Sequence, residues 1–188
     1  MKNILLLLIT TTFLACCSKD QPPTQLNPID QLPPATQTGA NTAGCLVNGQ
    51  AFLPKGNSFG GPILSCFYQQ DADGYHLGLS ITNKSSLENK SINISLNPQQ
   101  LTEGSTYMLV LRTNNGSSYT SNFGEYIITN NINSGFQYRT TNTITGEIKI
   151  TKLNASQKII SGTFWYDSIL SNDIIKVRDG RFDMRYVN

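Results

Sequence analysis

From about residue 45 onward, hydrophobic and polar residues alternate along the chain with a period of two. Successive side chains of a β-strand point to opposite faces, so this period is typical of strands with one buried face. The alternation recurs in several segments: Ile92, Ile94 and Leu96; Tyr107, Leu109 and Leu111; Ile148 and Ile150; Ile160, Phe164 and Tyr166; Phe182, Met184 and Tyr186. Because no window of ten or more residues in this region has a helical period, the pattern predicts an all-β domain.

Turn-forming residues separate the predicted strands. Asn48-Gly49 lies between Cys45-Leu46-Val47 and Gln50–Leu53, and the Asn-Gly pair readily takes the two positive φ angles of a type I′ hairpin turn. Asp71–Gly74 separates two further alternating segments. About ten short strands joined by such turns predict an antiparallel β-sandwich or a partly open barrel.

The N-terminus has the pattern of a secretion signal. Lys2 supplies a positive charge, and residues 4–13 form a short, mostly apolar run that begins Ile-Leu-Leu-Leu-Leu-Ile. A membrane-spanning helix needs about 20 apolar residues, so this run is too short to span a bilayer. The sequence therefore predicts a cleaved signal peptide over residues 1–16.

Leu14-Ala15-Cys16-Cys17 resembles the lipobox of bacterial lipoproteins, in which an aliphatic residue and two small residues precede a cysteine. In that family the cysteine thiol takes a diacylglycerol, the signal is cleaved just before it, and the new amino terminus is acylated. The resemblance favours Cys17 as the lipidated residue, because Leu14 and Ala15 then take the outer positions. Cys16, which has Ala15 beside the cleavage point, is the alternative. An ordinary cleaved signal with two incidental cysteines is the other interpretation.

Lipidation would make the lipid bilayer a partner of the protein. Several acyl chains give a durable anchor, whereas a single chain binds only marginally. We expect attachment to the bacterial outer membrane, on its periplasmic side or at the cell surface. Ser18-Lys19-Asp20 resembles the short acidic export tags of surface lipoproteins in Bacteroidota, but a tag of this length leaves both sides open.

Residues 17–40 are predicted to form a flexible tether that begins with the lipidated cysteine. Five prolines fall within residues 21–35 and favour extended polyproline II structure, and few large apolar residues are present to build a core. The remaining residues, 41–188, are enough for one domain with its own core. We therefore expect a single all-β domain over this range.

The charge of the chain is nearly balanced, with 14 Lys and Arg against 12 Asp and Glu and a net charge of +2. Nucleic-acid-binding domains usually carry a clear basic stripe, so this composition argues against a nucleic-acid partner. The most basic segment, residues 176–185, interleaves acids with its cations. In it Arg181, Asp183 and Arg185 alternate with apolar residues, and we interpret them as a solvated strand face.

Cys45 and Cys66 are the thiols that remain once the anchor is assigned. In an oxidising exported compartment they are predicted to form a disulfide between early strands, which would contribute about 3 kcal/mol. Two buried free thiols are the alternative. The chain has neither a Cys-x-x-Cys motif nor a second histidine, so no metal site and no cofactor are predicted.

Candidate catalytic groups are few. His76, the single histidine, lies opposite the apolar face of its predicted strand, and no Gly-x-Ser-x-Gly motif accompanies it, so a Ser-His-Asp site is not predicted. Four acids could supply the carboxylate pair of a glycosidase, whose separation the sequence cannot test: Glu125, Glu147, Asp167 and Asp173. No catalytic residue is assigned.

Two short motifs have a structural interpretation beside a functional one. Asp71-x-Asp73-Gly74 hints at a calcium loop but lacks the further ligands of that pattern, so a hairpin turn is favoured. Asp167-Ser168-Ile169 resembles the three-residue O-glycosylation site of exported Bacteroidota proteins, although such a triplet also occurs by chance.

Residues 114–145 are rich in Asn, Ser, Thr and Gly, with aromatic residues between them. Aromatic faces beside amides and hydroxyls are the chemistry of sugar-binding and peptide-binding surfaces. The aromatic residues of this segment are therefore candidates for a ligand surface: Tyr119, Phe123, Tyr126, Phe136 and Tyr138. The alternative is that they pack inward from edge strands.

Both ends of the predicted domain resemble one protein family. Residues 36–49, Thr-Gln-Thr-Gly-Ala-Asn-Thr-Ala-Gly-Cys-Leu-Val-Asn-Gly, are similar to the opening of an uncharacterised family of Bacteroidota lipoproteins. Residues 160–167 and 177–183 are similar to its closing hairpin. The resemblance implies a lipoprotein with a β-domain, and it supplies no activity.

The sequence leaves three functional hypotheses. The first is a non-enzymatic, membrane-anchored binding or adhesion module of the cell envelope, with a glycan or an envelope protein as its ligand. The second is an extracytoplasmic hydrolase that acts on glycan or peptide. The third, a structural envelope component, differs from the first only in lacking a ligand.

Overall fold

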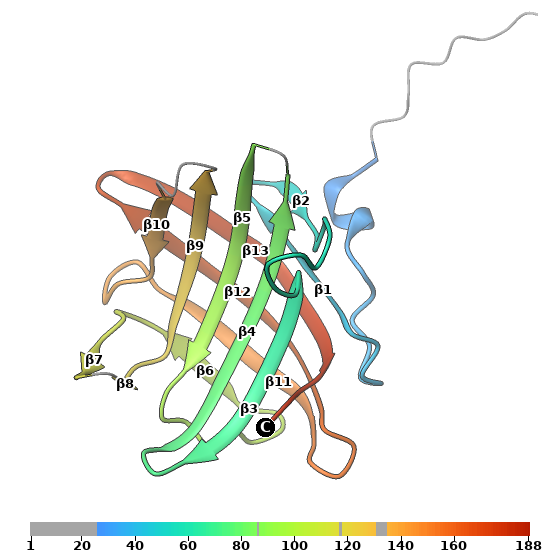
Figure 1. Ribbon diagram of the computed structural model, residues 1–188, viewed down its shortest axis with the longest axis vertical. Helices are drawn as coiled ribbons and strands as arrows, with labels where there is room; N and C mark the ends of the chain where they lie inside the picture. Colours follow the sequence, from blue (N-terminus) through green and yellow to red (C-terminus); the bar gives the residue numbers. More distant parts are fainter. Residues whose placement is uncertain (1–25, 86, 117, 131–134) are drawn as a thin grey trace, which may run out of the picture.

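The computed structural model describes residues 26–85, 87–116, 118–130 and 135–188 (Figure 1). The predicted signal peptide and both candidate lipidation cysteines, Cys16 and Cys17, lie outside these described residues. A short 3-10 helix, η1 (Pro28–Gln31), comes first. The strands are β1 (Thr42–Val47), β2 (Gln50–Phe52), β3 (Leu64–Asp71), β4 (Gly74–Lys84), β5 (Glu88–Leu96), β6 (Thr106–Leu109), β7 (Asn114–Asn115), β8 (Ser118–Tyr119), β9 (Phe123–Asn130), β10 (Gly135–Arg139), β11 (Gly146–Asn154), β12 (Ile159–Leu170) and β13 (Asp173–Arg185). No helix of the described part is long and apolar enough to cross a membrane.

Among the described residues, eleven strands form one sheet, with the order β2-β1-β13-β12-β10-β9-β5-β4-β3. All its strand pairs are antiparallel, and β7 and β8 form a separate two-stranded hairpin. The sheet branches at β12: β11 pairs with its first part, and Arg139 of β10 pairs with Ile169 near its end. β6 lies beyond β11. The all-β, antiparallel fold expected from the alternating pattern is thus confirmed.

The sheet curls so that its two ends approach each other (Figure 1). At one point Val187, just after β13, forms a bridge with Phe67 of β3, and the Tyr68 N–H donates to the Val187 carbonyl oxygen at 2.9 Å. At another, Lys55, just after β2, forms a bridge with Asn83 of β4. The result is a curled half-barrel, which corresponds to the partly open barrel of the two predicted architectures.

The alternating apolar residues face the interior of the curled sheet, as their period predicts. The residues that are least exposed there include Leu77, Leu79, Ile81, Ile92, Ile94, Leu96, Leu109, Ile148, Ile150, Ile160, Tyr166 and Val177. Leu111 is an exception: β6 ends at Leu109, and Leu111 is 41% exposed, so its predicted place on that strand face was wrong.

Residues 32–40, here called the strap, run over the outer face of the barrel before β1 begins. Leu32 and Gly39 are buried, and a Cβ on Gly44 would lie 3.1 Å from Pro33 Cδ. In Figure 1 the strap descends from η1 along the right-hand side of the barrel. The flexible tether expected over residues 17–40 is therefore corrected for residues 32–40, which pack against the barrel.

One carboxylate holds the strap in place. Asp183 of β13 is only 1% exposed and accepts hydrogen bonds from the hydroxyl groups of Thr36 and Thr38 and from the N–H groups of Thr38, Gly39 and Ala40. The Ser161 hydroxyl donates to it as well, at 2.8 Å. The solvated face predicted for Asp183 was therefore wrong, because the strap covers this residue.

Cys45 and Cys66 are free and buried, so the disulfide predicted between them is corrected to two buried thiols. Cys45 lies on β1 opposite Phe52, and Cys66 lies on β3 opposite Leu79. β1 and β3 are not neighbours in the sheet, and a disulfide requires close Cα atoms and facing Cβ vectors. Burial raises the pKa of each thiol to about 12.

Candidate ligand-binding groove

A groove of about 210 Å³ lies on the outer face of β3, β4, β5 and β9, the four strands at the front of Figure 1. The strand register arranges its residues in two rows across these strands. The first row is Phe67, Gly78, Ser95 and Phe123. The second row is Ser65, Ser80, Asn93 and Glu125. The groove therefore joins an aromatic row to a polar row.

The position of the Phe67 ring in the first row requires a glycine on the neighbouring strand. Phe67 lies directly opposite Gly78, and a Cβ added to Gly78 would come within 2.1 Å of the Phe67 ring carbon Cε1. The ring therefore rests over the space that a side chain would fill. It is 38% exposed, so an aromatic surface remains open to solvent at this end of the groove.

The other wall of the groove belongs to residues 111–122, here called the arm, which include the β7–β8 hairpin. The Arg112 guanidinium lies 4.0 Å from the ring centre of Tyr119 and 5.3 Å from that of Phe123. The rings of Tyr119 and Phe123 meet edge to face with their centres 5.3 Å apart. Because cation–π and edge-to-face contacts hold these three side chains together, the arm is packed onto the start of β9.

Glu125 lies at one end of the groove and binds two arginines there. Its side chain is nearly buried, and its Oε1 accepts hydrogen bonds from Arg112 at 2.6 Å and from Arg139 at 2.9 Å. Arg112 also donates to the Tyr119 hydroxyl. Two guanidinium groups thus surround one carboxylate, and this end of the groove carries a net positive charge.

Polar side chains line the floor of the groove: Ser65, Ser80, Asn93 and Ser95. In the described part of the chain, their hydroxyl and amide groups have no protein hydrogen-bond partner. All four are partly exposed, so water or a ligand can bind them. Free hydroxyl and amide groups between aromatic surfaces can bind a ligand that has both hydroxyl groups and an apolar face.

The structure separates the five aromatic residues predicted to form a ligand surface. Tyr119 and Phe123 line the groove, although Phe123 is only 2% exposed beneath the arm. Tyr126 and Tyr138 are buried and face the core, so their predicted place on a surface was wrong. Phe136 is exposed at the start of β10 but does not line the groove.

Tyr126 and Tyr138 point inward because they occupy positions of β9 and β10 whose side chains face the core. They lie opposite each other in the register, with ring centres 6.1 Å apart. Burial raises the pKa of Tyr126 to about 12. The Tyr138 hydroxyl donates to Asp173 at 2.8 Å, and this hydrogen bond raises the pKa of Tyr138.

His76 lies between two side-chain acceptors. Its Nδ1 is 3.0 Å from the Asn97 Oδ1, and its Nε2 is 3.0 Å from the Asp71 Oδ1. Asp71 also accepts the Asp73 N–H at 2.8 Å, which closes the hairpin turn. This backbone hydrogen bond is the main cause of the lowered pKa of Asp71. Within the described residues, no cluster of acidic, histidine or cysteine side chains could hold a metal ion.

The four candidate carboxylates lie on four different strands and do not gather in one site. Glu125 is bound by two arginines, Asp167 pairs with Arg178 at 2.7 Å, and Asp173 accepts the Tyr138 hydroxyl. Glu147 lines a separate hollow beside Trp165. Ser168, the central residue of the O-glycosylation triplet, is fully buried, so its hydroxyl is not accessible to a modifying enzyme in the folded protein.

The groove residues on β3, β4 and β5 were not predicted from the sequence. One signal was available: in a hairpin that turns at Asp71–Gly74, counting back along both strands places Phe67 opposite Gly78. The contact between the arm and β9 gave no such signal. The arm reaches the start of β9 because the chain folds back on itself there, and no hairpin register fixes which residues meet.

Comparisons with known proteins identify a family but no function. A family model described as Domain of unknown function (DUF6252) matches residues 70–184, more than half of the chain. The match includes the groove residues Gly78, Asn93 and Glu125 but begins after Phe67 and the strap. No curated protein and no solved structure matches the chain. The chain therefore belongs to the DUF6252 family of domains of unknown function.

Proposed function

We propose that this protein is an exported, lipid-anchored binding protein of the bacterial outer membrane whose half-barrel binds glycan in the groove between Phe67 and the arm. The observation that carries the proposal is the arrangement of the groove, in which the exposed ring of Phe67 lies beside the free hydroxyl and amide groups of Ser80 and Asn93.

A sugar ring matches both rows. Its C–H faces stack on an aromatic ring such as Phe67, and its hydroxyl groups exchange hydrogen bonds with Ser80, Asn93 and their neighbours. The groove, at about 210 Å³, is smaller than the roughly 300–1,000 Å³ of small-molecule pockets. It therefore suits one part of a longer glycan chain that continues along the open surface.

The groove test compares binding of the purified protein to a panel of immobilised oligosaccharides and to isolated cell-wall glycan. Phe67→Ala removes the stacking ring, and Gly78→Ala displaces it. Each is expected to weaken binding about tenfold, because one aromatic contact contributes about 0.5–1.5 kcal/mol beyond its buried area. Phe136→Ala, which removes an exposed ring outside the groove, is the matched control and should bind as the wild type does. Failure of the wild type to retain any saccharide would refute the proposed ligand class.

The proposed anchor rests on the lipobox resemblance and on the short apolar run before it. Mass spectrometry of the protein extracted from bacterial membranes should find an N-terminal cysteine with added acyl mass. Cys17→Ser should release the protein from the membrane fraction, and Cys16→Ser should leave it there. An unmodified amino terminus, or an uncut precursor in the cytosol, would contradict the anchor and leave the groove test unaffected.

A glycan hydrolase is the second candidate, because Glu147 and Asp179 line one hollow beside Trp165. Such an enzyme needs one carboxyl group kept protonated, usually by apolar surroundings. Asp179 is exposed, and Lys149 and Arg181 line the same hollow. We therefore favour binding, and in the oligosaccharide assay we expect no new reducing ends. Their release by the wild type and not by Glu147→Gln would establish the hydrolase instead.

A further inference from the structure

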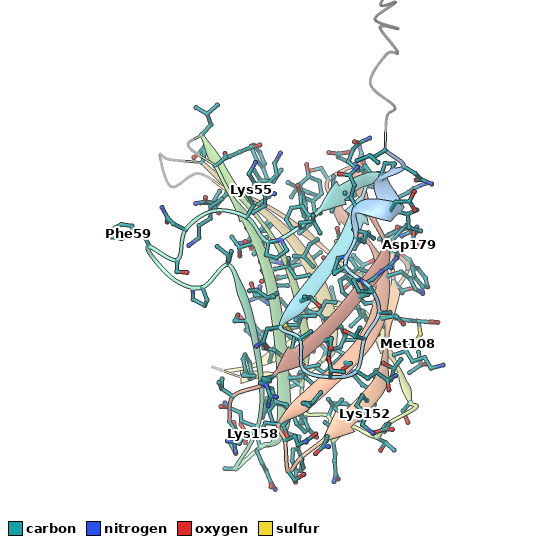
Figure 2. The ribbon with its side chains drawn as sticks, turned by 90° about the vertical axis from the view of Figure 1, so that its right-hand side faces the viewer. Lys55, Phe59, Met108, Lys152, Lys158 and Asp179 are labelled. Atoms are coloured by element: carbon teal, nitrogen blue, oxygen red, sulfur yellow. The ribbon has the colours of Figure 1, made fainter. Side chains whose placement is uncertain are left out.

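A second hollow, of about 400 Å³, lies on the outer face of β6, β11, β12 and β13. This volume falls within the roughly 300–1,000 Å³ of small-molecule sites. Figure 2 shows Asp179 and Met108 on this side of the barrel. The hollow shares none of its lining residues with the groove at Phe67.

Two rows of side chains of opposite charge cross the hollow. In the acidic row, Glu147 lies directly opposite Trp165, and Asp179 lies on the other side of Trp165 on β13. In the basic row, Thr163 lies between Lys149 and Arg181. Each member of the basic row is two residues from the acidic row on its own strand, so the rows are about 7 Å apart.

The charges of the hollow are largely unpaired. In the part of the chain that the structure describes, the carboxylates of Glu147 and Asp179 and the ammonium of Lys149 make no ion pair. Arg181 donates at 3.4 Å to the backbone oxygens of Asp179 and Pro33, and none of the described carboxylates pairs with its guanidinium. A ligand that carries both charges can therefore satisfy both rows.

Trp165, which lies between Glu147 and Asp179 in the acidic row, supplies an apolar surface. Its side chain is 37% exposed, and the Arg178 guanidinium lies 5.4 Å from its ring. Arg178 is itself paired with Asp167 at 2.7 Å, so it leaves the two carboxylates of the acidic row free. The exposed indole can contact an aliphatic stem that joins a positive and a negative group.

The backbone holds the acidic row in place. The register between β12 and β13 shifts opposite Trp165, so that Arg178 and Asp179 together face this one residue as a β-bulge. Asp179 has a φ of 52°, in the left-handed region. Bulges re-aim side chains, and aspartate tolerates the left-handed backbone at this position. Ala35 of the strap closes one side of the hollow.

We infer that this hollow binds a dipolar ligand, one that carries an ammonium and a carboxylate about 7 Å apart on an aliphatic stem, such as a lysine side chain near a free carboxylate in a peptide. The ammonium lies between Glu147 and Asp179, the stem packs against Trp165, and the carboxylate lies between Lys149 and Arg181. The inference is independent of the glycan groove.

The single tryptophan of the chain makes the test direct, because all tryptophan emission comes from this hollow. The probes are 6-aminohexanoate, hexylamine and hexanoate, which share a stem and differ in their charged groups. We expect 6-aminohexanoate to shift the Trp165 emission in a saturable way. It should bind at least tenfold more tightly than hexylamine or hexanoate.

Substitutions in each row test which charged group of 6-aminohexanoate that row binds. Glu147→Gln should weaken 6-aminohexanoate at least fivefold and leave hexanoate unchanged, and Lys149→Gln should weaken it similarly and leave hexylamine unchanged. Phe67→Ala, in the other groove, is the control and should bind 6-aminohexanoate as the wild type does. No saturable shift, equal affinity for hexylamine and 6-aminohexanoate, or wild-type affinity in both row variants would overturn the inference.

Discussion

Replacing Asp183 by asparagine is expected to lower the free energy of unfolding by about 3 kcal/mol. The carboxylate accepts six hydrogen bonds from the strap and from Ser161. Hydrogen bonds to a charged group make a net contribution of about 1.5–3 kcal/mol to stability, and buried donors left without an acceptor are destabilising. The asparagine amide has one oxygen in place of two, and its NH₂ group would face N–H donors. Urea denaturation at pH 7 measures the loss.

Asp179→Asn is the matched control for this substitution. Asp179 lies on the same strand and is exposed, and asparagine tolerates its positive φ. Its change in unfolding free energy should stay within about 0.5 kcal/mol. An equal loss in both variants would show that net charge, and not the strap contacts, sets the stability.

The contribution of Asp183 should also depend on pH. Burial by itself raises the pKa of this carboxyl group, but the hydrogen bonds from Thr36, Thr38, Ser161 and Gly39 outweigh burial and hold the pKa far below its ordinary 3.8. Because the folded pKa is the lower one, the stabilisation is complete above the unfolded pKa and declines as pH falls below it. The difference between wild type and Asp183→Asn should be constant above about pH 5 and shrink below pH 4.

The strands could be predicted from sequence because their signal is local. In β4 and β5, the residues Leu77, Leu79, Ile92 and Ile94 alternate with polar neighbours and are all buried. One buried face is enough to produce this period. The choice between a sandwich and a half-barrel could not be made this way. It depends on which strands pair across long stretches of chain, such as β1 with β13 and β5 with β9.

The burial of Asp183 could not be predicted from the local alternation of residues. Its alternation with Phe182 and Met184 correctly places it on the outer face of β13. An outward carboxylate is ordinarily solvated, and here the strap, more than 140 residues earlier in the chain, covers it. The prolines that predicted an extended tether do not distinguish a segment that is free from one that is packed against the barrel.

The candidate site was predicted only in part, for a related reason. The composition of residues 114–145 directed attention to the correct wall of the groove, since Tyr119 and Phe123 line it. Composition does not tell which residues of a strand face the core, and Tyr126 and Tyr138 face it. Trp165 and its flanking charges were missed because each charge is unremarkable in its own strand. They form two rows only when β11, β12 and β13 are in register.

Glu125→Gln is expected to have the second large effect, on stability and on binding together. Removing one partner of a buried ion pair is destabilising by about 3–5 kcal/mol, and the partial exposure of Arg112 and Arg139 reduces this to about 2 kcal/mol. Arg112 also holds Tyr119 against Phe123, so the arm should loosen. Oligosaccharide binding in the groove should then weaken about tenfold, and limited proteolysis should cut within residues 111–122 sooner than in the wild type.

Arg139→Gln separates the carboxylate's two roles. Arg139 binds the same Glu125 oxygen but is 43% exposed and does not touch the rings of the arm. We expect this variant to lose at most about 1 kcal/mol, as exposed ion pairs do, and to keep wild-type binding and proteolysis of the arm. Glu125 would be shown to act on stability alone if Glu125→Gln lowered the unfolding free energy but bound saccharide as tightly as Arg139→Gln. In that case the contacts of Tyr119 and Phe123, and not the buried carboxylate, would hold the arm in its place as a wall of the groove.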